Sequence, residues 1–420
     1  MENRYRWKES VGRIEERRPN FNRWAVHNTK EETGWHTEYA HYNQTLGLGF
    51  YEYFLLCEMI GASPLPVLSA GLACQYQSYE LVEPEDSEFD EFLQDALDLV
   101  EFANGSVDTY WGSLRSRMGH PTPFGLTMLG IGNEQWETKE SRFFERYCAF
   151  EQTIHAKYPD IKLIGSAGPD IVSDYHSAAW QFYRQKCDVN GTFCYAVDEH
   201  YYVKPEWFYD HTDFYDEYSR DVKVFSGEYA AHPVYEGDME AANTLGGALA
   251  EAAFLTGVER NADVVILASY APLFARVGYA QWAPNMIWFD EQRAYCTPSY
   301  YVQKLYSENM GIVTIPMEGQ EKELAKESLY VNLSLDERTN ELILKAVNHN
   351  EETKELTLVM PENIISDGQA KWKILSGKET DYNSITEPDR VTIREEIVDF
   401  IGKLELEPMS FSVIRIPLLT

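Results

Sequence analysis

Cysteine is sparse in this chain, and none of the cysteines has the spacing of a metal-ligand set or a disulfide framework. Six cysteines occur among 420 residues, without a Cys-x-x-Cys pair. The ten histidines include no His-Glu-x-x-His motif, and no glycine-rich phosphate loop is present. We therefore expect free buried thiols, no metal and no cofactor.

Positive charge and long apolar runs are also in short supply. The chain has 36 Lys and Arg against 68 Asp and Glu, a net charge of -32. This excess repels nucleic acid and anionic lipid surfaces, so we expect a neutral ligand and no binding to nucleic acid or membranes. No apolar run approaches the roughly 20 residues that cross a bilayer, and residues 1–6 do not form a signal peptide. The chain as given is expected to be soluble, and its compartment stays open.

Aromatic residues, by contrast, are abundant. The 28 Tyr, 20 Phe and 10 Trp make up 14% of the chain. Core packing explains most of these rings, but the surplus is typical of proteins that stack on the apolar faces of sugars.

Apolar runs alternate with amphipathic stretches between about residues 46 and 308. The apolar runs are continuous, which is typical of buried parallel strands covered by helices. This order predicts an α/β fold, a (β/α)-barrel of the TIM-barrel type, as a catalytic domain over residues 1–310. Predicted strands cover 65–70, 126–131, 162–166, 193–197, 222–225 and 264–269, and predicted helices include 51–60, 92–102, 142–158, 177–186 and 243–256.

The pattern changes after Gly311. Short alternating runs, separated by turns that carry Asn, Asp or Gly, occupy 329–333, 341–347, 355–359, 371–375 and 410–416. They predict a C-terminal antiparallel β-sandwich domain over residues 311–420.

The strand count falls short of a closed barrel, because six βα units are found where eight are required. Residues 1–45 are polar and basic without an apolar run of four, which favours loop over strand. We therefore expect an incomplete barrel of six parallel strands, with Leu65, Val67 and Val265 near its opening.

Two of the predicted strands deliver a carboxylate where they end. One continues into Gly132-Asn133-Glu134-Gln135-Trp136 and the other into Ser226-Gly227-Glu228-Tyr229. A glycosidase needs such a pair, because one acid protonates the leaving group while the other attacks or stabilises. Taken singly, Glu134 is equally explained as a helix N-terminal acid and Glu228 as a solvated loop acid.

Five motifs occur in order over nearly the whole chain: Gly132-Asn133-Glu134-Gln135-Trp136, residues 161–169, Asp198-Glu199-His200-Tyr201-Tyr202, residues 224–232 and residues 268–274. Together they resemble the α-L-arabinofuranosidases of glycoside hydrolase family 51. The resemblance implies that Glu134 is the acid/base at the end of strand four and Glu228 the nucleophile at the end of strand seven. It also implies that the first two family strands are missing, so that Met1 falls inside the expected catalytic domain. Whether the chain alone is active, and whether a signal peptide is missing with those strands, stays open.

The reaction implied by the resemblance is retaining hydrolysis of terminal non-reducing α-L-arabinofuranosyl residues from arabinan or arabinoxylan. Asn133 suits a hydrogen bond to the sugar 2-hydroxyl, and Trp136 suits stacking on the leaving group. His200 and Tyr202 are alternate residues that follow the predicted strand 193–197, and they share a face. We expect Tyr202 to donate to Glu228 and His200 to orient it.

Alternatives stay open at this point. His200 is also explained as a histidine with a purely structural role. Trp136 and Trp288 are equally explained by packing. His232 and Glu137 are taken as structural. Another retaining hydrolase of the same clan, such as a β-glycanase, would show an open cleft, and an inactive carbohydrate-binding fragment is a third class. The sequence does not fix the polysaccharide, the linkage or whether the chain forms a homo-oligomer.

Overall fold

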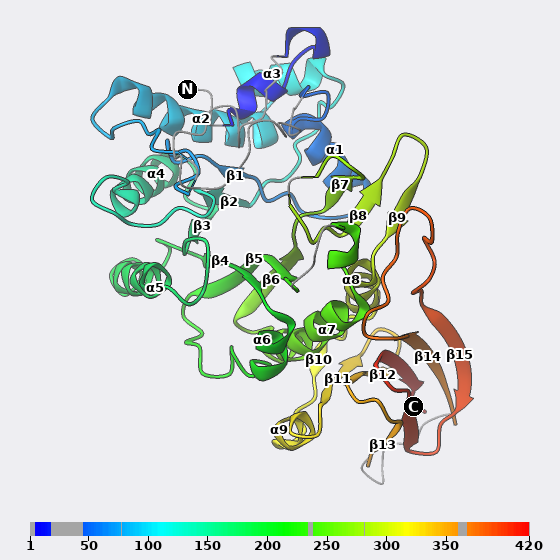
Figure 1. Cartoon of the computed structure of the whole chain (residues 1–420). Helices are drawn as coiled ribbons and strands as arrows, with labels where there is room; N and C mark the ends of the chain where they lie inside the picture. The colour runs from blue at the N-terminus through cyan, green and yellow to red at the C-terminus, as the bar shows by residue number, and fades with distance from the viewer. Residues whose placement is uncertain are drawn as a thin grey trace. The chain divides into compact units, whose positions relative to one another are not determined.

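The computed structural model describes residues 5–17, 45–76, 78–233, 238–280, 282–359 and 368–419 (Figure 1). The chain divides into two compact units. The first contains Met1–His200 and Asp221–Phe225, and the second contains Tyr201–Arg220 and Ser226–Thr420. This division does not test the boundary expected near residue 310, which stays a prediction.

A six-stranded sheet in the order β1-β2-β3-β4-β5-β6 follows the order of the sequence. Strands β1 to β4 pair in parallel. The prediction of six parallel strands is confirmed, and β1 and β6, which carry Val67 and Val265, are the edge strands. The strands are β1 (Val67–Leu68), β2 (Met128–Ile131), β3 (Lys162–Ser166), β4 (Ala196–Val203), β5 (Lys223–Ala231) and β6 (Val265–Tyr270).

Helices occupy the connections between these strands, as the alternating pattern predicts. Helix α7 is buried from Leu245 to Val258, and a Cβ at Gly257 would lie 1.8 Å from the carbonyl oxygen of Thr212, so only glycine permits this approach. The helices are α1 (Phe50–Met59), α2 (Ser87–Asn104), α3 (Tyr110–Arg117), α4 (Phe143–Lys157), α5 (Asp174–Cys187), α6 (Pro205–Asp210), α7 (Leu245–Arg260) and α8 (Pro298–Glu308). None of the helices in the described ranges is both long enough and apolar enough to cross a bilayer.

Strands β4 and β5 extend further at their carboxyl ends than the sequence indicated. His200 and Tyr202 lie inside β4, and Glu228 lies inside β5 rather than after it. The prediction was wrong there because polar residues interrupt the apolar runs while the backbone stays extended. The His232 backbone N–H, for example, still donates to the Val203 carbonyl at 2.7 Å.

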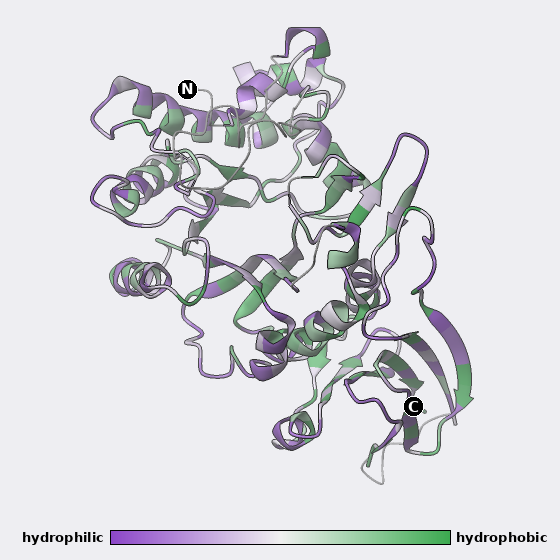
Figure 2. Ribbon diagram, in the orientation of Figure 1, coloured by the Kyte–Doolittle hydropathy of each residue, from purple (hydrophilic) through white to green (hydrophobic). Residues whose placement is uncertain are grey.

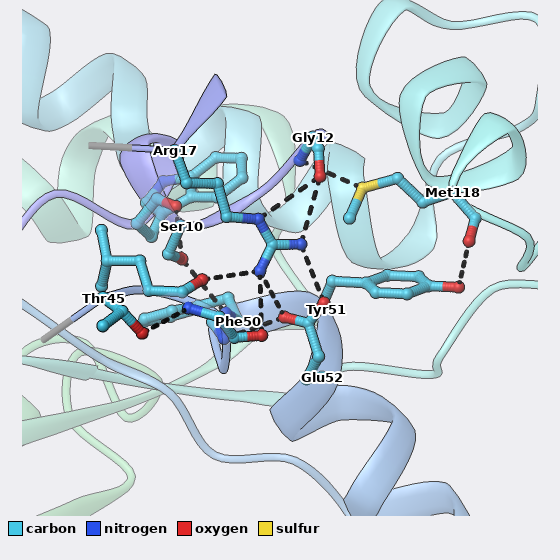
Figure 3. A network of polar contacts seen from close by, with 12 residues as sticks. Ser10, Gly12, Arg17, Thr45, Phe50, Tyr51, Glu52 and Met118 are labelled. Carbon is cyan, nitrogen blue, oxygen red and sulfur yellow. Dashed lines mark hydrogen bonds and ion pairs between the residues drawn. The ribbon is translucent and has the colours of Figure 1, made fainter. Parts of the chain in front are cut away.

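The segment before α1 was expected to be loop, and its described part, residues 5–17, contains two short 3-10 helices, η1 (Trp7–Ser10) and η2 (Ile14–Glu16). Residues 18–44, where Trp24 and His27 occur, lie outside the described residues. The Arg17 guanidinium is buried and makes paired hydrogen bonds of 2.8 and 2.9 Å to the Glu52 carboxylate on α1 (Figure 3). This ion pair ties the segment to the first helix.

At Gly49 the backbone before α1 packs closely against the N-terminal segment. A Cβ there would lie 2.0 Å from the Ser10 carbonyl oxygen. The Phe50 N–H at the start of α1 donates to Ser10 Oγ at 3.1 Å, which satisfies an otherwise free helix N-terminal donor (Figure 3).

The C-terminal region is antiparallel, as predicted. A six-stranded sheet in the order β10-β11-β12-β17-β14-β15 and a two-stranded β13-β16 sheet share one apolar core. Strand β14 alternates apolar and polar residues, with Trp372 buried between Lys371 and Lys373. Hydrophobic and hydrophilic segments both occur along the strands of this region, as the colours of Figure 2 show. The strands are β10 (Val313–Thr314), β11 (Leu329–Asp336), β12 (Glu341–Asn348), β13 (Lys354–Thr357), β14 (Gln369–Ser376), β15 (Arg394–Asp399), β16 (Lys403–Leu406) and β17 (Ser410–Pro417), with helix α9 (Gln320–Ala325) before β11.

A three-stranded sheet made of β7 (Phe274–Arg276), β8 (Ile287–Phe289) and β9 (Ala294–Cys296) was not predicted. Trp288 on β8 is 1% exposed and belongs to a small apolar cluster that includes Tyr295. Trp288 therefore packs structurally.

A buried ion pair links α7 to the C-terminal sheet within the second unit. The ammonium of Lys345 on β12 contacts Glu259 on α7, and Asn332 of β11 donates to the same carboxylate at 2.7 Å. The Lys345 side chain is fully buried, and burial lowers its pKa. Such a pair is costly to break, because either partner alone would leave an uncompensated buried charge.

Candidate active site

Glu134 lies on a tight turn that follows β2. Gly132 has φ +80° and Glu134 has φ +55°, so both occupy the left-handed region. A Cβ at Gly132 would lie 2.7 Å from Oε1 of Gln135, so this position requires glycine. Gln135 Oε1 in turn accepts a hydrogen bond of 2.7 Å from the Asn133 N–H.

Hydrogen bonds from neighbouring elements hold this turn. The Gln75 carboxamide bonds both the N–H and the carbonyl of Trp136, at 3.0 and 3.1 Å. Ser166 Oγ, at the end of β3, donates to the Gln135 carbonyl at 3.0 Å. The strained backbone at Glu134 is thus fixed from both sides, which positions its side chain.

His200 on β4 connects Glu134 to a second carboxylate. His200 Nδ1 lies 3.0 Å from Glu134 Oε1, and Nε2 lies 3.2 Å from Asp198 Oδ2. The His200 side chain is 2% exposed, whereas that of Glu134 is 24% exposed. A ring with a carboxylate at each nitrogen is held in one orientation, so His200 supports Glu134, a contact that the sequence did not predict.

The opposite face of β4 points toward helices. Glu199 is fully buried and accepts hydrogen bonds from Trp180 Nε1 at 2.7 Å and from His176 Nε2 at 2.7 Å, both on α5. This alternation leaves Asp198, His200 and Tyr202 together on the other face.

In the second unit, Tyr202 contacts Glu228. The Tyr202 hydroxyl donates to Glu228 Oε2 at 2.7 Å, the expected hydrogen bond. Trp282 lies against Tyr202 with ring centroids 5.2 Å apart, and against His232 at 5.1 Å. Burial lowers the pKa of His232, which favours its neutral form. Trp282 has no signal in the sequence that separates it from a packing residue.

The other expected residues lie beside Glu134. Asn133 is exposed, and Trp136 is buried between Tyr76 and Tyr175. The Glu137 carboxylate accepts from the Phe144 N–H at 2.7 Å at the start of α4, so its contact is structural. Asp198, Tyr76 and Tyr175 were not predicted, although the period of two along Asp198-Glu199-His200 could have identified Asp198.

A buried acid on α7 contacts the end of β5. Glu251 on α7 is 1% exposed and accepts from the Ala231 N–H at 2.9 Å. Burial raises the pKa of Glu251 to about 8, so its protonated form dominates at neutral pH. None of the six cysteines belongs to a disulfide, as expected, but only Cys194 is buried and the other five are half-buried, so the expectation of buried thiols holds for Cys194 alone. Burial raises the pKa of Cys194 to about 12.

Comparison with known proteins identifies the family. A model described as the alpha-L-arabinofuranosidase 1 domain matches residues 1–220, and one described as the alpha-L-arabinofuranosidase C-terminal domain matches residues 227–410. An extracellular exo-alpha-L-arabinofuranosidase of Streptomyces chartreusis is 42% identical over 313 residues, covering 74% of this chain and 34% of the relative. Alpha-L-arabinofuranosidase 1 of Arabidopsis thaliana is 31% identical over 428 residues, covering 98% and 56%.

The chain thus spans about half, or less, of the length of these relatives. Among solved structures, an arabinose-bound GH51 α-L-arabinofuranosidase superposes with a TM-score of 0.80 at 26% identity, over 99% of this chain and 62% of the other. An enzyme of the same name from Thermotoga maritima, at 19% identity and a TM-score of 0.70 over 100% and 85%, shares the fold. On the family models and these relatives, the chain belongs to the α-L-arabinofuranosidases of glycoside hydrolase family 51.

Proposed function

We propose that this chain is a retaining glycoside hydrolase that releases terminal non-reducing α-L-arabinofuranosyl residues from arabinan or arabinoxylan chains. The observation that carries the proposal is a pair of contacts along one strand. On β4, His200 contacts Glu134 and Tyr202, two residues later, donates to Glu228. Family membership favours the arabinofuranosyl unit as the sugar.

Alternate residues of a strand share a face and lie about 7 Å apart. Two carboxylates held by such neighbours are directed toward the same space, as a double-displacement reaction needs. Retaining enzymes use a separation of about 5–5.5 Å, whereas inverting enzymes leave room for a water between the acids. We therefore assign Glu134 and Glu228 to one site.

In the proposed reaction, a carboxylate oxygen of Glu228 attacks the anomeric carbon. Glu134 donates its proton to the glycosidic oxygen as that bond breaks, and a glycosyl ester on Glu228 results. Glu134, now ionised, takes a proton from water, and the water oxygen attacks the same carbon. Arabinose leaves with its configuration retained, and both carboxyl groups return to their starting states.

The remaining residues bind and orient. The exposed Asn133 carboxamide is assigned to the sugar 2-hydroxyl, a contact that strengthens as positive charge develops on the ring. Trp136 is assigned to the leaving group. His200 is a positioning residue for Glu134, and Tyr202 is one for Glu228.

The test is hydrolysis of 4-nitrophenyl α-L-arabinofuranoside by the purified chain, with the first-formed anomer read by NMR. We expect retention, loss of turnover in Glu228→Ala with rescue by azide, and unchanged rates in the control Glu140→Ala, an exposed acid near the same turn. Glu134→Ala should mainly impair substrates with poor leaving groups, because an activated phenol scarcely needs protonation.

Other outcomes contradict specific parts of the proposal. The inverted anomer would exclude the nucleophile assignment. Turnover of a β-xylan or β-glucan in preference to arabinofuranosides would indicate a different hydrolase of the clan. Binding of arabino-oligosaccharides with no turnover of any glycoside would indicate a carbohydrate-binding fragment.

A further inference from the structure

Three aromatic rings from separate segments of the chain meet beside Glu134 in the first unit. The ring centroids of Tyr76 and Trp136 are 5.0 Å apart, and those of Trp136 and Tyr175 are 5.4 Å apart. We call these residues the Tyr76–Trp136–Tyr175 cluster. Tyr76 follows β1, Trp136 follows β2, and Tyr175 opens α5 after β3. All three thus come from the carboxyl ends of adjacent parallel strands, the edge where barrel enzymes bind substrate.

The two outer rings are exposed, which packing alone does not explain. Trp136 is 9% exposed, but Tyr76 is 51% and Tyr175 is 42% exposed. Two exposed tyrosine rings that pack on a buried tryptophan form a surface that is apolar at the ring faces and polar at the tyrosine hydroxyls. That is the surface with which proteins bind sugar rings, since tyrosine and tryptophan have large apolar areas and few rotatable bonds.

The cluster is fixed to the turn that carries Glu134. Gln75, the residue before Tyr76, makes the two hydrogen bonds to the Trp136 backbone. Gly168, with φ +91°, lies where a Cβ would be 3.4 Å from Cβ of Trp136 and 3.7 Å from Cβ of Tyr175. The rings therefore keep a set position relative to Glu134, which stands two residues before Trp136.

Two carboxylates, those of Asp170 and Glu134, act on Tyr76. Burial raises the pKa of the Tyr76 hydroxyl, and the carboxylates of Asp170 and Glu134 add to this effect. Carboxylates accept hydrogen bonds from sugar hydroxyls but repel a uronic acid. The surroundings favour a neutral sugar.

We propose that the Tyr76–Trp136–Tyr175 cluster is the leaving-group subsite, which holds the neutral sugar ring whose glycosidic oxygen receives the proton of Glu134. This rests on the proposed function, in which Glu134 is the acid. It adds Tyr76 and Tyr175 as residues that select among leaving groups.

Binding measurements test the cluster without depending on turnover. In a Glu228→Gln background, calorimetry gives Kd for α-1,5-arabinotriose, which supplies a leaving-group ring, and for methyl α-L-arabinofuranoside, which does not. We expect Tyr76→Ala and Tyr175→Ala each to lower the preference for arabinotriose over the methyl glycoside about tenfold. Tyr76→Phe, which keeps the ring, should restore most of that preference.

The matched control is Tyr53→Ala, because Tyr53 is an exposed tyrosine of the same unit, 49% exposed, outside the cluster. An equal loss on both ligands, or none, in Tyr76→Ala and Tyr175→Ala would overturn the subsite. A galacturonate-terminated analogue that binds more tightly than its neutral counterpart would overturn the selection for neutral sugars.

The two proposals fail in different ways. If the chain hydrolyses no arabinofuranoside but the binding preference drops as stated, the proposed function fails and the sugar-binding cluster stands. If turnover is retained and the preference is unaffected, the function stands and the cluster is structural packing.

Discussion

The Tyr202 hydroxyl donates a 2.7 Å hydrogen bond to Glu228 from a position two residues beyond His200, which contacts Glu134. One strand therefore supports both acids through neighbouring side chains on a single face. Each support can be removed separately, and the consequences differ.

Removing the phenol should impair Glu228 directly. A hydrogen bond to a charged group is worth about 1.5–3 kcal/mol. Tyr202→Phe should therefore lower kcat about 10- to 100-fold on aryl arabinofuranosides, with a smaller change in KM. The Tyr53→Ala variant serves as the control for general damage. A change confined to KM would show that Tyr202 binds the sugar rather than orienting Glu228.

Removing the support of Glu134 should depend on the leaving group. Asp198→Asn weakens the hold on His200 Nε2, and His200→Ala removes the contact with Glu134 itself. We expect losses of roughly tenfold and a hundredfold on arabino-oligosaccharides, and much smaller losses on 4-nitrophenyl arabinofuranoside. Comparing kcat/KM on the two substrates decides this. Equal losses would mean that His200 acts on both acids or on the fold.

The buried Glu251 makes stability depend on pH. Its folded pKa of about 8 lies above the usual value of a glutamate, so the unfolded chain releases this proton first as pH rises. Its contribution to folding is therefore most favourable below about pH 4.5 and declines up to about pH 8. Glu251→Gln removes this titration and keeps an acceptor for the Ala231 N–H.

The native chain loses stability as pH rises, because Glu251 ionises first in the unfolded chain, and the variant does not lose stability in this way. The free energy of unfolding of Glu251→Gln relative to that of the native chain should therefore rise by on the order of 3 kcal/mol from pH 5 to pH 8. Thermal unfolding of both proteins at pH 5, 6.5 and 8 measures the gain. Glu140→Gln provides an exposed control. A Tm difference that stays constant with pH would contradict the prediction.

Gly49 tests the docking of the N-terminal segment on α1. Alanine there would place a Cβ 2.0 Å from the Ser10 carbonyl, so Gly49→Ala should destabilise the chain by about 1–3 kcal/mol or more. Gly191→Ala is the control, because no atom lies within 4 Å of that position. Similar Tm values for the two variants would show that the segment shifts to make room.

Treating the protein with a metal chelator distinguishes catalysis by carboxyl groups from catalysis by a bound metal ion. Glu134, His200 and Glu228 carry donor atoms that a divalent metal ion could also use. Because the proposed reaction uses carboxyl groups alone, prior treatment with EDTA should leave kcat/KM within about twofold. A large loss that zinc or calcium restores would instead indicate a metal enzyme.

The strands could be predicted from the sequence where they are buried, because a buried strand has a continuous run of apolar residues. Strand β3 has the bounds that its apolar run indicated, because it is buried between neighbours. Strand β15, Arg394–Asp399, was missed since it is exposed and acidic, and only its pairing with β14 makes it a strand. Residues 18–44 lie outside the described residues, so the expectation for most of the first 45 remains a prediction.

The site could be predicted where its residues are adjacent in the sequence. Glu134 and Glu228 follow apolar runs, and His200 and Tyr202 share the period of a strand. The partner of His200 could not be read from the sequence, because the turn at Glu134 comes from a different strand. The same holds for Tyr76 and Tyr175, which meet Trp136 only because the segments that follow β1, β2 and β3 converge.

The contact between Lys345 and Glu259 limits how this protein can recombine with its relatives. Lys345 belongs to the C-terminal sheet and Glu259 to α7, so a crossover between them would pair each residue with a foreign partner. A hybrid that lacks the matching charge would leave an ion buried alone and lose about 3–5 kcal/mol. Helix α7 and the C-terminal sheet are therefore expected to be inherited together, and chimeras should place their junction before α7.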